Sequence, residues 1–417
     1  MRRPGSIHWA WIVLATCFMD LFINYSVRLG YGVVLPEMIE TLGFSRTAGG
    51  SIYNSYLLCY LAFTPVTGYL TDRLGARRVI TTCSLILGLG VLLMGTIDTL
   101  WRACLYYALA GLGATGMWTP VITVVQRWFA PHRRGLALGI LSTGYGLGFA
   151  AMGALFPWVV HHFNWRYAWY FLGAGAMAMA AANGVFLRSD PAGEGATPWG
   201  QKGPHPAPRS PRSAGSGPGG AGALIFRNPN FWIIGVSYFC VAYSLYGITT
   251  FMVDYAKYQM GLSTEKASLL ATVHGFAQVA GVLTILPLSD VLGRKRTIIL
   301  SNAFITCALG GILFSGGSWK VLFVLVGVLA LFYGATFPIY GACAGDYFPR
   351  RVMGTVIGSW TPFYGLGAVL SHWVTGMLRD ATGQYDRAFL INALLATLGL
   401  VFISLVRKGG LEDGHPS

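Results

Sequence analysis

Charged residues are scarce in this sequence: Asp, Glu, Lys and Arg make up 11% of its 417 residues, whereas 54% are hydrophobic. A soluble protein of this length would carry roughly a quarter charged residues. Apolar runs of about 18 or more residues recur along the whole chain, and each is long enough to cross the hydrocarbon core of a bilayer. The composition therefore argues against a soluble protein and predicts a polytopic protein embedded in the lipid bilayer.

The sequence also lacks the motifs of several functional classes. Its seven cysteines form no Cys-x-x-Cys pair, so we expect packed core residues and neither disulfides nor metal ligands. No Walker sequence is present, which excludes an ATP-driven pump in this chain, and no HExxH or GxSxG motif supports an intramembrane enzyme. The glycine-rich stretch 142–157 lies inside an apolar segment, where its GxxxG-like spacing predicts close helix packing. We expect no cofactor, no metal, no nucleic-acid partner and no enzymatic activity.

Twelve hydrophobic segments predict an all-α membrane protein with twelve transmembrane helices. They lie near 9–35, 52–70, 79–98, 102–126, 135–160, 167–187, 230–253, 268–288, 297–316, 319–342, 354–377 and 387–406. The stretch 188–226 is rich in Pro, Gly and Ser, which is typical of a flexible linker. We therefore expect an N-terminal six-helix bundle in 1–187, a cytoplasmic linker in 188–226 and a C-terminal six-helix bundle in 227–417.

The distribution of basic residues predicts the orientation in the membrane. If the N-terminus is cytoplasmic, about two thirds of the 29 Lys and Arg residues fall on the inner side, as the positive-inside rule requires. We expect a multi-pass protein of the plasma (inner) membrane, with both termini in the cytoplasm.

Two loops of the first half recur in the second. The sequence GYLTDRLGARRVI after the second segment matches LPLSDVLGRKRTI after the eighth, so that Asp72 pairs with Asp290 and Gly75 with Gly293. WFAPHRRGLALG after the fourth segment matches YFPRRVMGTVIG after the tenth at nearly the same offset. Two pseudo-symmetric bundles are the construction expected of a transporter with a site near the bilayer midplane.

The D-R-x-G-x-R-R pattern of the first loop resembles the signature loop of the major facilitator superfamily. An aspartate among arginines next to a helix end can latch two helices at the cytoplasmic face, and a glycine permits the tight turn. Positive-inside topology alone is the alternative explanation of the basic residues. The expected cytoplasmic gating residues are Asp72, Arg73, Gly75, Arg77, Arg78, Asp290, Gly293 and Arg294.

A closer resemblance comes from the run YAKYQMGLSTEK, which is similar to the monocarboxylate transporter family. RNPNFWIIG and RWFAPHRRGLALG resemble the oxalate–formate antiporter group. The resemblance implies transport of small carboxylates, with a proton or in exchange for another anion. This chain departs from the family in the eighth segment, where Gln278 and Val282 occupy the places of the usual acid and arginine, and near Thr361, where the antiporters carry a lysine.

Asp20, Asn24 and Arg28 form a polar stripe on the first segment, because four-residue steps rotate only about 40° around a helix. Arg28 is expected to bind a substrate carboxylate; the alternative is an arginine that snorkels to the outer interface. Asp20 is expected near mid-membrane as a proton-coupling group, or else as a neutral hydrogen-bonded acid or a partner of Arg28. Asn24 is expected to bind substrate or to orient Arg28.

Helix rise places His274 at the depth of Arg28 and Gln278 at that of Asp20, so a central cavity could hold all four side chains. His274 is expected as a substrate or proton-coupling group, with a packing role as the alternative. Gln278 can donate to a carboxylate. Residues in Gly- or Pro-interrupted stretches are further candidates for the cavity lining: Trp118, Thr119, Tyr145, Tyr333, Trp360 and Tyr364.

These features together predict a secondary transporter that works by alternating access, with lactate- or pyruvate-type organic anions as substrates and proton symport as the mechanism. Anion exchange, facilitated passage of a neutral or zwitterionic solute, and a nontransporting receptor are the alternatives. The expected partners are the anion, a proton and the lipid bilayer, and the expected oligomeric state is a monomer.

Overall fold

Long helices account for nearly all of the part of the chain that the structure describes. The computed structural model describes residues 8–201, 225–314, 317–348 and 353–406. The first half contains α1 (Trp9–Arg28), α2 (Tyr31–Leu42), α3 (Arg46–Leu74), α4 (Ala76–Met94), α5 (Leu100–Ala114), η1 (Thr115–Met117), α6 (Thr119–Trp128), η2 (Pro131–Arg133), α7 (Arg134–His162) and α8 (Trp165–Phe186). The second half contains α10 (Pro229–Asp254), η4 (Tyr255–Gln259), α11 (Thr264–Leu292), α12 (Arg294–Leu313), α13 (Trp319–Tyr347), α14 (Met353–Thr382) and α15 (Asp386–Leu405).

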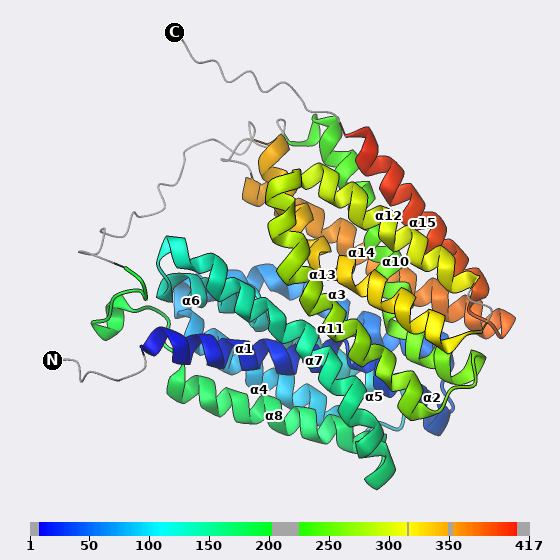
Figure 1. Cartoon of the computed structure of the whole chain (residues 1–417). Coiled ribbons are helices and arrows are strands. Elements are labelled where there is room, and N and C mark those ends of the chain that lie inside the picture. The colour runs from blue at the N-terminus through cyan, green and yellow to red at the C-terminus, as the bar shows by residue number, and fades with distance from the viewer. Residues whose placement is uncertain (1–7, 202–224, 315–316, 349–352, 407–417) are drawn as a thin grey trace.

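Within the described residues these helices make twelve passages in two bundles of six, which confirms the predicted all-α fold (Figure 1). The pair α1 and α2 forms the first passage, α5, η1 and α6 the fourth, and α10 with η4 the seventh. In the described parts of the chain, nine helical stretches are long and apolar enough to cross a membrane, and the less hydrophobic α3, α8 and α14 complete the set. The chain is a multi-pass membrane protein.

The turns that repeat in the sequence of the two halves also have the same backbone conformation. Gly75 joins α3 to α4 with φ 84° and ψ 143°, and Gly293 joins α11 to α12 with φ 86° and ψ 140°. Both glycines have a positive φ, which confirms the predicted tight turns, because only glycine adopts this conformation without strain. A second matched pair, Gly43 with φ 67° and Gly261 with φ 69°, lies ahead of α3 and α11.

Glycines of α7 provide close packing on two sides. A Cβ added at Gly148 would lie 2.3 Å from the Phe22 carbonyl oxygen of α1, and one added at Gly146 would lie 2.7 Å from the Gly275 carbonyl oxygen of α11. No side chain fits at these approaches. The close packing predicted from the GxxxG-like spacing is therefore confirmed, and it joins the two halves across α7 and α11.

Among the described residues, the two halves pack closely toward one end and not toward the other. We name the ends by α3, which runs from the Arg46 end to the Gly75 end. Toward the Arg46 end, a Cβ at Gly50 would lie 2.6 Å from the His372 carbonyl oxygen of α14. Toward the Gly75 end, a Cβ added at Gly68, Gly139 or Gly358 would meet nothing within 4 Å. Figure 1 shows the same arrangement, with the bundles converging near α2 and diverging toward α6 and the start of α14.

The start of the expected linker is held against the first half. Trp199 donates its backbone N–H to the Trp128 carbonyl at 2.8 Å, and its ring lies 5.0 Å from Trp11 and 5.7 Å from Phe129. A large aromatic side chain thus anchors a polar segment. Residues 202–224, which carry most of the expected linker, lie outside the described residues.

Candidate functional site

Arg28 is the last residue of α1, and its side chain reaches the second half. Nη2 donates a hydrogen bond to the hydroxyl oxygen of Tyr246 on α10 at 2.7 Å. The guanidinium carbon lies 5.3 Å from the ring centre of Tyr60, 5.8 Å from that of Tyr25 and 5.9 Å from that of Tyr246. Arg28 is 9% exposed, so the side chain is buried at the boundary between the halves.

The backbone around Arg28 explains this position. The chain turns between α1 and α2 at Leu29 and Gly30, where a Cβ on Gly30 would lie 2.0 Å from the Ser26 carbonyl oxygen. Two residues later, a Cβ on Gly32 would lie 2.6 Å from the Thr250 carbonyl oxygen of α10. Because glycine permits this approach, the start of α2 lies directly against α10, and the arginine just ahead of it reaches the neighbouring aromatic rings.

The charge of Arg28 has no ionic partner among the described residues. None of the ion pairs there includes it, and its Nε has no hydrogen-bond partner. Aromatic faces attract a cation, but by only about 0.5–2 kcal/mol each. A buried charge without a counter-ion is unfavourable. The arrangement is therefore suited to binding an anion.

Aromatic residues from both halves surround this position. Tyr25 lies 5.0 Å from Tyr145 of α7 and 6.5 Å from Trp118, as measured between ring centres. Trp118 lies 6.1 Å from Phe337 of α13, which lies 6.0 Å from Tyr364 of α14. Tyr364 in turn lies 5.7 Å from Tyr246, the partner of Arg28. The structure thus brings the predicted Trp118, Tyr145 and Tyr364 into one cluster with the arginine.

Trp360 and Thr119, which the sequence also predicted to line the cavity, lie outside this cluster. Trp360 stacks on Phe231 at 6.0 Å and donates its indole N–H to the Phe231 carbonyl at 2.9 Å, near the start of α10. Thr119 is exposed at the start of α6, directly after the break at η1.

His274 and Gln278 lie where α7, α11 and α13 meet. The His274 ring is 5.1 Å from Phe149 and 5.4 Å from Tyr333. Both His274 and Gln278 are almost fully buried, and neither the two ring nitrogens nor the Gln278 Oε1 atom has a hydrogen-bond partner among the described residues. Unsatisfied polar atoms at this junction of both halves are ones whose missing hydrogen bonds a ligand could supply.

The polar stripe of α1 divides between two environments. Asp20 accepts a hydrogen bond from Asn183 of α8 at 2.8 Å, and Asn183 also donates to Ser84 of α4 at 3.0 Å. Asn24 accepts from Tyr56 of α3 at 3.3 Å. Each four-residue step turns the side chain by about 40°, so two steps carry the stripe from the interior of the first half at Asp20 to the boundary at Arg28. Asp20 therefore does not join Arg28 in one cluster.

The expected gating residues make contacts within their own halves. The backbone N–H of Arg77 donates to Ser189 at 3.0 Å, and its side chain donates to the Gly184 carbonyl. Arg294 pairs with Asp346 at 3.0 Å and with Asp290 at 3.6 Å. Asp72, Arg73 and Arg78 are exposed. The repeat of the second loop in YFPRRVMGTVIG falls partly at 349–352, outside the described residues.

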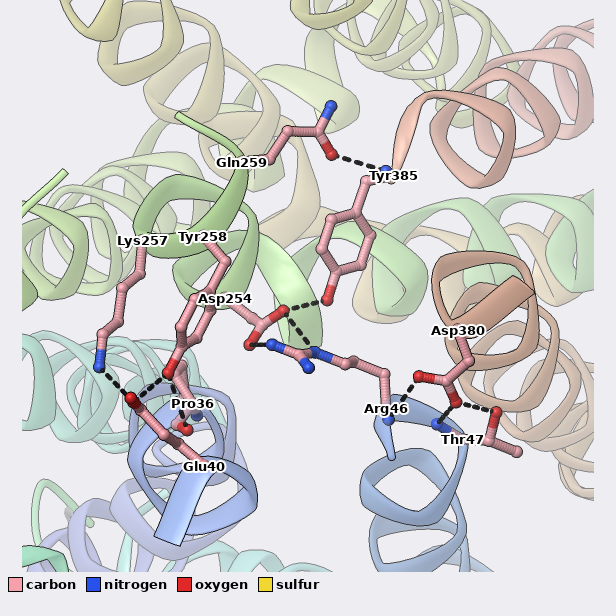
Figure 2. A network of polar contacts seen from close by, with 10 residues as sticks. All are labelled: Pro36, Glu40, Arg46, Thr47, Asp254, Lys257, Tyr258, Gln259, Asp380 and Tyr385. Atoms are coloured by element: carbon pink, nitrogen blue, oxygen red, sulfur yellow. Dashed lines mark hydrogen bonds and ion pairs between the residues drawn. The ribbon is translucent and has the colours of Figure 1, made fainter. Parts of the chain in front are cut away.

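A polar network at the Arg46 end connects the halves instead, and sequence reasoning missed it (Figure 2). Arg46 of α3 lies 3.3 Å from the buried carboxylate of Asp254 on α10, which also accepts a hydrogen bond from the Tyr385 hydroxyl. Asp380 of α14 accepts hydrogen bonds from the backbone N–H groups of Arg46 and Thr47 at 2.9 and 2.8 Å.

The basic residue of η4, Lys257, adds to this network. Lys257 lies 2.5 Å from Glu37 and 3.2 Å from Glu40 of α2. Lys257 belongs to the YAKYQ run that carries the family resemblance, so its position was visible in the sequence although its partners were not.

Comparison with known proteins agrees with this architecture. The family model described as Major Facilitator Superfamily matches residues 12–268 and 234–415. A probable sulfoacetate transporter of Cupriavidus necator is 22% identical over 93% of this chain and 91% of its own. Monocarboxylate transporter 11 of Homo sapiens is 27% identical over 97% of this chain and 84% of its own.

Among solved structures, a bacterial homologue of the human lysosomal transporter Spinster, in an inward-facing and unoccupied conformation, superposes with a TM-score of 0.77. It is 17% identical and covers 96% of this chain and 97% of its own, a likeness that concerns the fold. The resemblance drawn from the signature loop and the YAKYQ run is confirmed by these relatives.

Proposed function

This chain belongs to the major facilitator superfamily and is a transporter, and we propose that its substrates are small organic anions that bind through Arg28. One observation carries the proposal: a buried guanidinium, without an ionic partner among the described residues, lies between the two halves. A carboxylate placed there would form charge-assisted hydrogen bonds and neutralise the charge. The cargoes after which these two relatives are named, sulfoacetate and monocarboxylates, are likewise organic anions.

The rest of the cluster suits such a ligand. Trp118, Tyr145 and Tyr364 offer apolar faces to a short carbon skeleton. His274 and Gln278, at the junction of α7, α11 and α13, carry polar atoms that have no hydrogen-bond partner among the described residues. A site made of one fixed cation, a few polar groups and aromatic walls is typical of small-molecule pockets. We therefore infer lactate- or pyruvate-type monocarboxylates as the first substrates to test.

The proposal includes an orientation of the chain in the membrane. When both termini lie on the cytoplasmic side of the inner membrane, the Arg46 end faces the outside of the cell and the Gly75 end faces the cytoplasm. The tight contacts at the Arg46 end then make this conformation one that is closed to the outside. Exchange between this form and its counterpart, through rocking of the two halves around Arg28, would move the anion across the bilayer.

A ligand screen followed by transport tests this proposal. Thermal unfolding of the purified protein is measured with pyruvate, lactate, dicarboxylates and uncharged metabolites, because a ligand of the folded state raises the unfolding temperature. Uptake of the best ligand into proteoliposomes is then measured for Arg28→Ala, Arg28→Lys and the control Arg102→Ala, whose arginine is an exposed surface residue.

We expect Arg28→Ala to weaken binding about 100-fold, because charge-assisted hydrogen bonds contribute about 1.5–3 kcal/mol each. Arg28→Lys should retain part of the affinity, and the control should match the wild type. A carboxylate uptake that is unchanged in Arg28→Ala, or stabilisation by uncharged solutes alone, would refute the proposal. Substrate-driven alkalinisation of the outer solution indicates proton symport, and its absence indicates exchange or uniport.

A further inference from the structure

A buried histidine that sequence reasoning did not single out connects the two halves. His372 of α14 is 0% exposed. Its Nδ1 lies 2.8 Å from the Oδ1 atom of Asn54 on α3, and its Nε2 lies 2.9 Å from the Thr250 hydroxyl of α10. The imidazole thus touches the first half through Asn54 and the second half through Thr250.

The hydrogen-bond directions define where its proton lies. Asn54 donates its amide Nδ2–H to the Val369 carbonyl at 2.9 Å, so its Oδ1 atom is the acceptor that faces His372. Nδ1 of His372 therefore carries the hydrogen of the neutral ring, and Nε2 accepts from the Thr250 hydroxyl. A hydroxyl group can rotate and accept instead, so Nε2 can take up a proton without losing either contact.

His372 also lies close to the proposed anion site. Its ring centre is 5.7 Å from that of Tyr246, whose hydroxyl binds Arg28 and whose ring centre is 5.9 Å from the guanidinium carbon. These two distances place the imidazole within about 12 Å of the guanidinium carbon, where two positive charges disfavour each other about tenfold at an effective dielectric constant near 20. An anion bound to Arg28 would remove this repulsion.

We propose that His372 is the residue that carries the coupled proton, and that its protonation and anion binding at Arg28 favour each other. This inference rests on the proposed anion transport. Coupling between two sites is reciprocal, so an anion that eases protonation is itself bound more tightly by the protonated protein. In the step itself, the imidazole accepts a proton from water while the Arg46 end is open and releases it to water when the ring meets the solvent of the other side.

The position of His372 fits such an exchange. The contact between α3 and α14 lies at the Arg46 end, where the halves must separate in the opposite conformation. In the present conformation the ring is sealed, with the Asn54 contact spanning the halves. Opening at the Arg46 end would break that contact and expose the Nδ1 edge of the imidazole, so that Nδ1 can exchange a proton with the solvent on that side while Nε2 stays at Thr250. The same movement would therefore expose both the proton site and the anion site.

The other titratable and charged groups around His372 are accounted for. Tyr53 of α3 lies 4.4 Å away between ring centres, and Tyr246 of α10 separates it from Arg28. Asp254, one turn beyond Thr250, is occupied by Arg46 and Tyr385. Asp380 of α14 accepts hydrogen bonds from Thr47. The backbone carbonyl of Asn392 on α15 accepts one from the Ser244 hydroxyl, and the side-chain amide of Asn392 has no partner among the described residues. Among the described residues no carboxylate pairs with His372.

A titration without any substrate tests the link between the two charges. Histidine ring signals of the full-length protein in nanodiscs are followed by NMR from pH 4 to pH 9, and the His372 signal is identified by its loss in His372→Gln. We expect His372 to protonate at an about tenfold lower proton concentration in Arg28→Gln than in the wild type, because the nearby charge is removed. Arg28→Lys, which keeps the charge, should follow the wild type. Equal behaviour of the three proteins, or no titration of His372 in Arg28→Gln, would overturn the inference.

Transport provides the second measurement. Proteoliposomes with an internal pH-sensitive dye receive an inward pyruvate gradient. We expect internal acidification by the wild type, an at least tenfold slower acidification by His372→Gln, and continued exchange of labelled pyruvate by that variant. If His372→Gln still moves protons with pyruvate at the wild-type rate, His372 is not the carrier. If the wild type does not move pyruvate or any other carboxylate, the proposed function fails, and the NMR titration still decides whether the two charges are linked.

Discussion

The ion pair between Arg46 and Asp254 should control the balance between the two conformations of this transporter. Asp254 is fully buried, and the side chain of Arg46 is 24% exposed, with 3.3 Å between Nε and Oδ2. The pair connects α3 of the first half to α10 of the second, so it exists only while the Arg46 end is closed (Figure 2). Replacing Arg46 by Gln leaves a buried carboxylate without its cation.

The size of the effect follows from this burial. Removing one partner of a buried ion pair costs about 3–5 kcal/mol. The partial exposure of Arg46 and the remaining hydrogen bond from Tyr385 reduce this cost, and we take roughly 2–3 kcal/mol. Because about 1.4 kcal/mol corresponds to a tenfold change in an equilibrium constant, Arg46→Gln should shift the ratio of closed to open forms about 30- to 140-fold toward opening at this end.

Distances between spin labels measure the shift directly. Thr41 of α2 and Arg387 of α15 are exposed on opposite halves at the Arg46 end and can carry the labels once the accessible native cysteines are replaced by serine. The wild type should show a short distance, and Arg46→Gln a longer one. The matched control is the double variant with Asp254→Asn, since removing both partners leaves no uncompensated charge and should restore most of the short distance.

Two outcomes would refute this reasoning. If Arg46→Gln keeps the distance distribution of the wild type, the ion pair does not hold the Arg46 end closed. If the double variant opens as far as the single variant, the effect comes from lost packing of the arginine side chain and not from the buried charge.

The glycines of the fold provide the remaining predictions. Gly275→Ala should reduce transport and lower the unfolding temperature, because its Cβ would lie 2.3 Å from the Gly146 carbonyl oxygen, whereas Gly139→Ala, with nothing within 4 Å, should be neutral in both measurements. Gly75→Ala and Gly293→Ala should each destabilise the protein by about 1–3 kcal/mol, because both glycines have φ near +85°. Thermal unfolding measures this loss, and a stability equal to that of the wild type would contradict the need for glycine at these turns.

The architecture could be predicted from the sequence because its signals are local. Long apolar runs must form helices in lipid, where every backbone N–H and C=O group needs an internal partner. The match of Asp72 and Gly75 with Asp290 and Gly293 revealed the duplication, and the structure shows the same backbone angles at both glycines. The relatives confirm the family that these motifs indicated.

The site was predictable only in part, because depth along a helix can be counted from sequence but direction around it depends on the neighbouring helices. Arg28 and Asp20 lie on one stripe, yet Arg28 contacts Tyr246 of the second half and Asp20 contacts Asn183 of the first. The expected latch around Asp72 was inferred from charges adjacent in sequence. The charges that join the halves, such as Arg46 and Asp254, are 208 residues apart and carry no local pattern.

The sequence by itself determined the class of protein, the number of helices and the duplicated halves, since hydrophobicity and repeated turns act over short stretches of chain. Only the tertiary structure decided that the halves are closed at the Arg46 end and that His372 lies between α3 and α10. It also decided that Arg28 is surrounded by tyrosines and pairs with no acid in the part of the chain that the structure describes. These features arise from contacts between distant helices, and such contacts depend on how two bundles face each other in space.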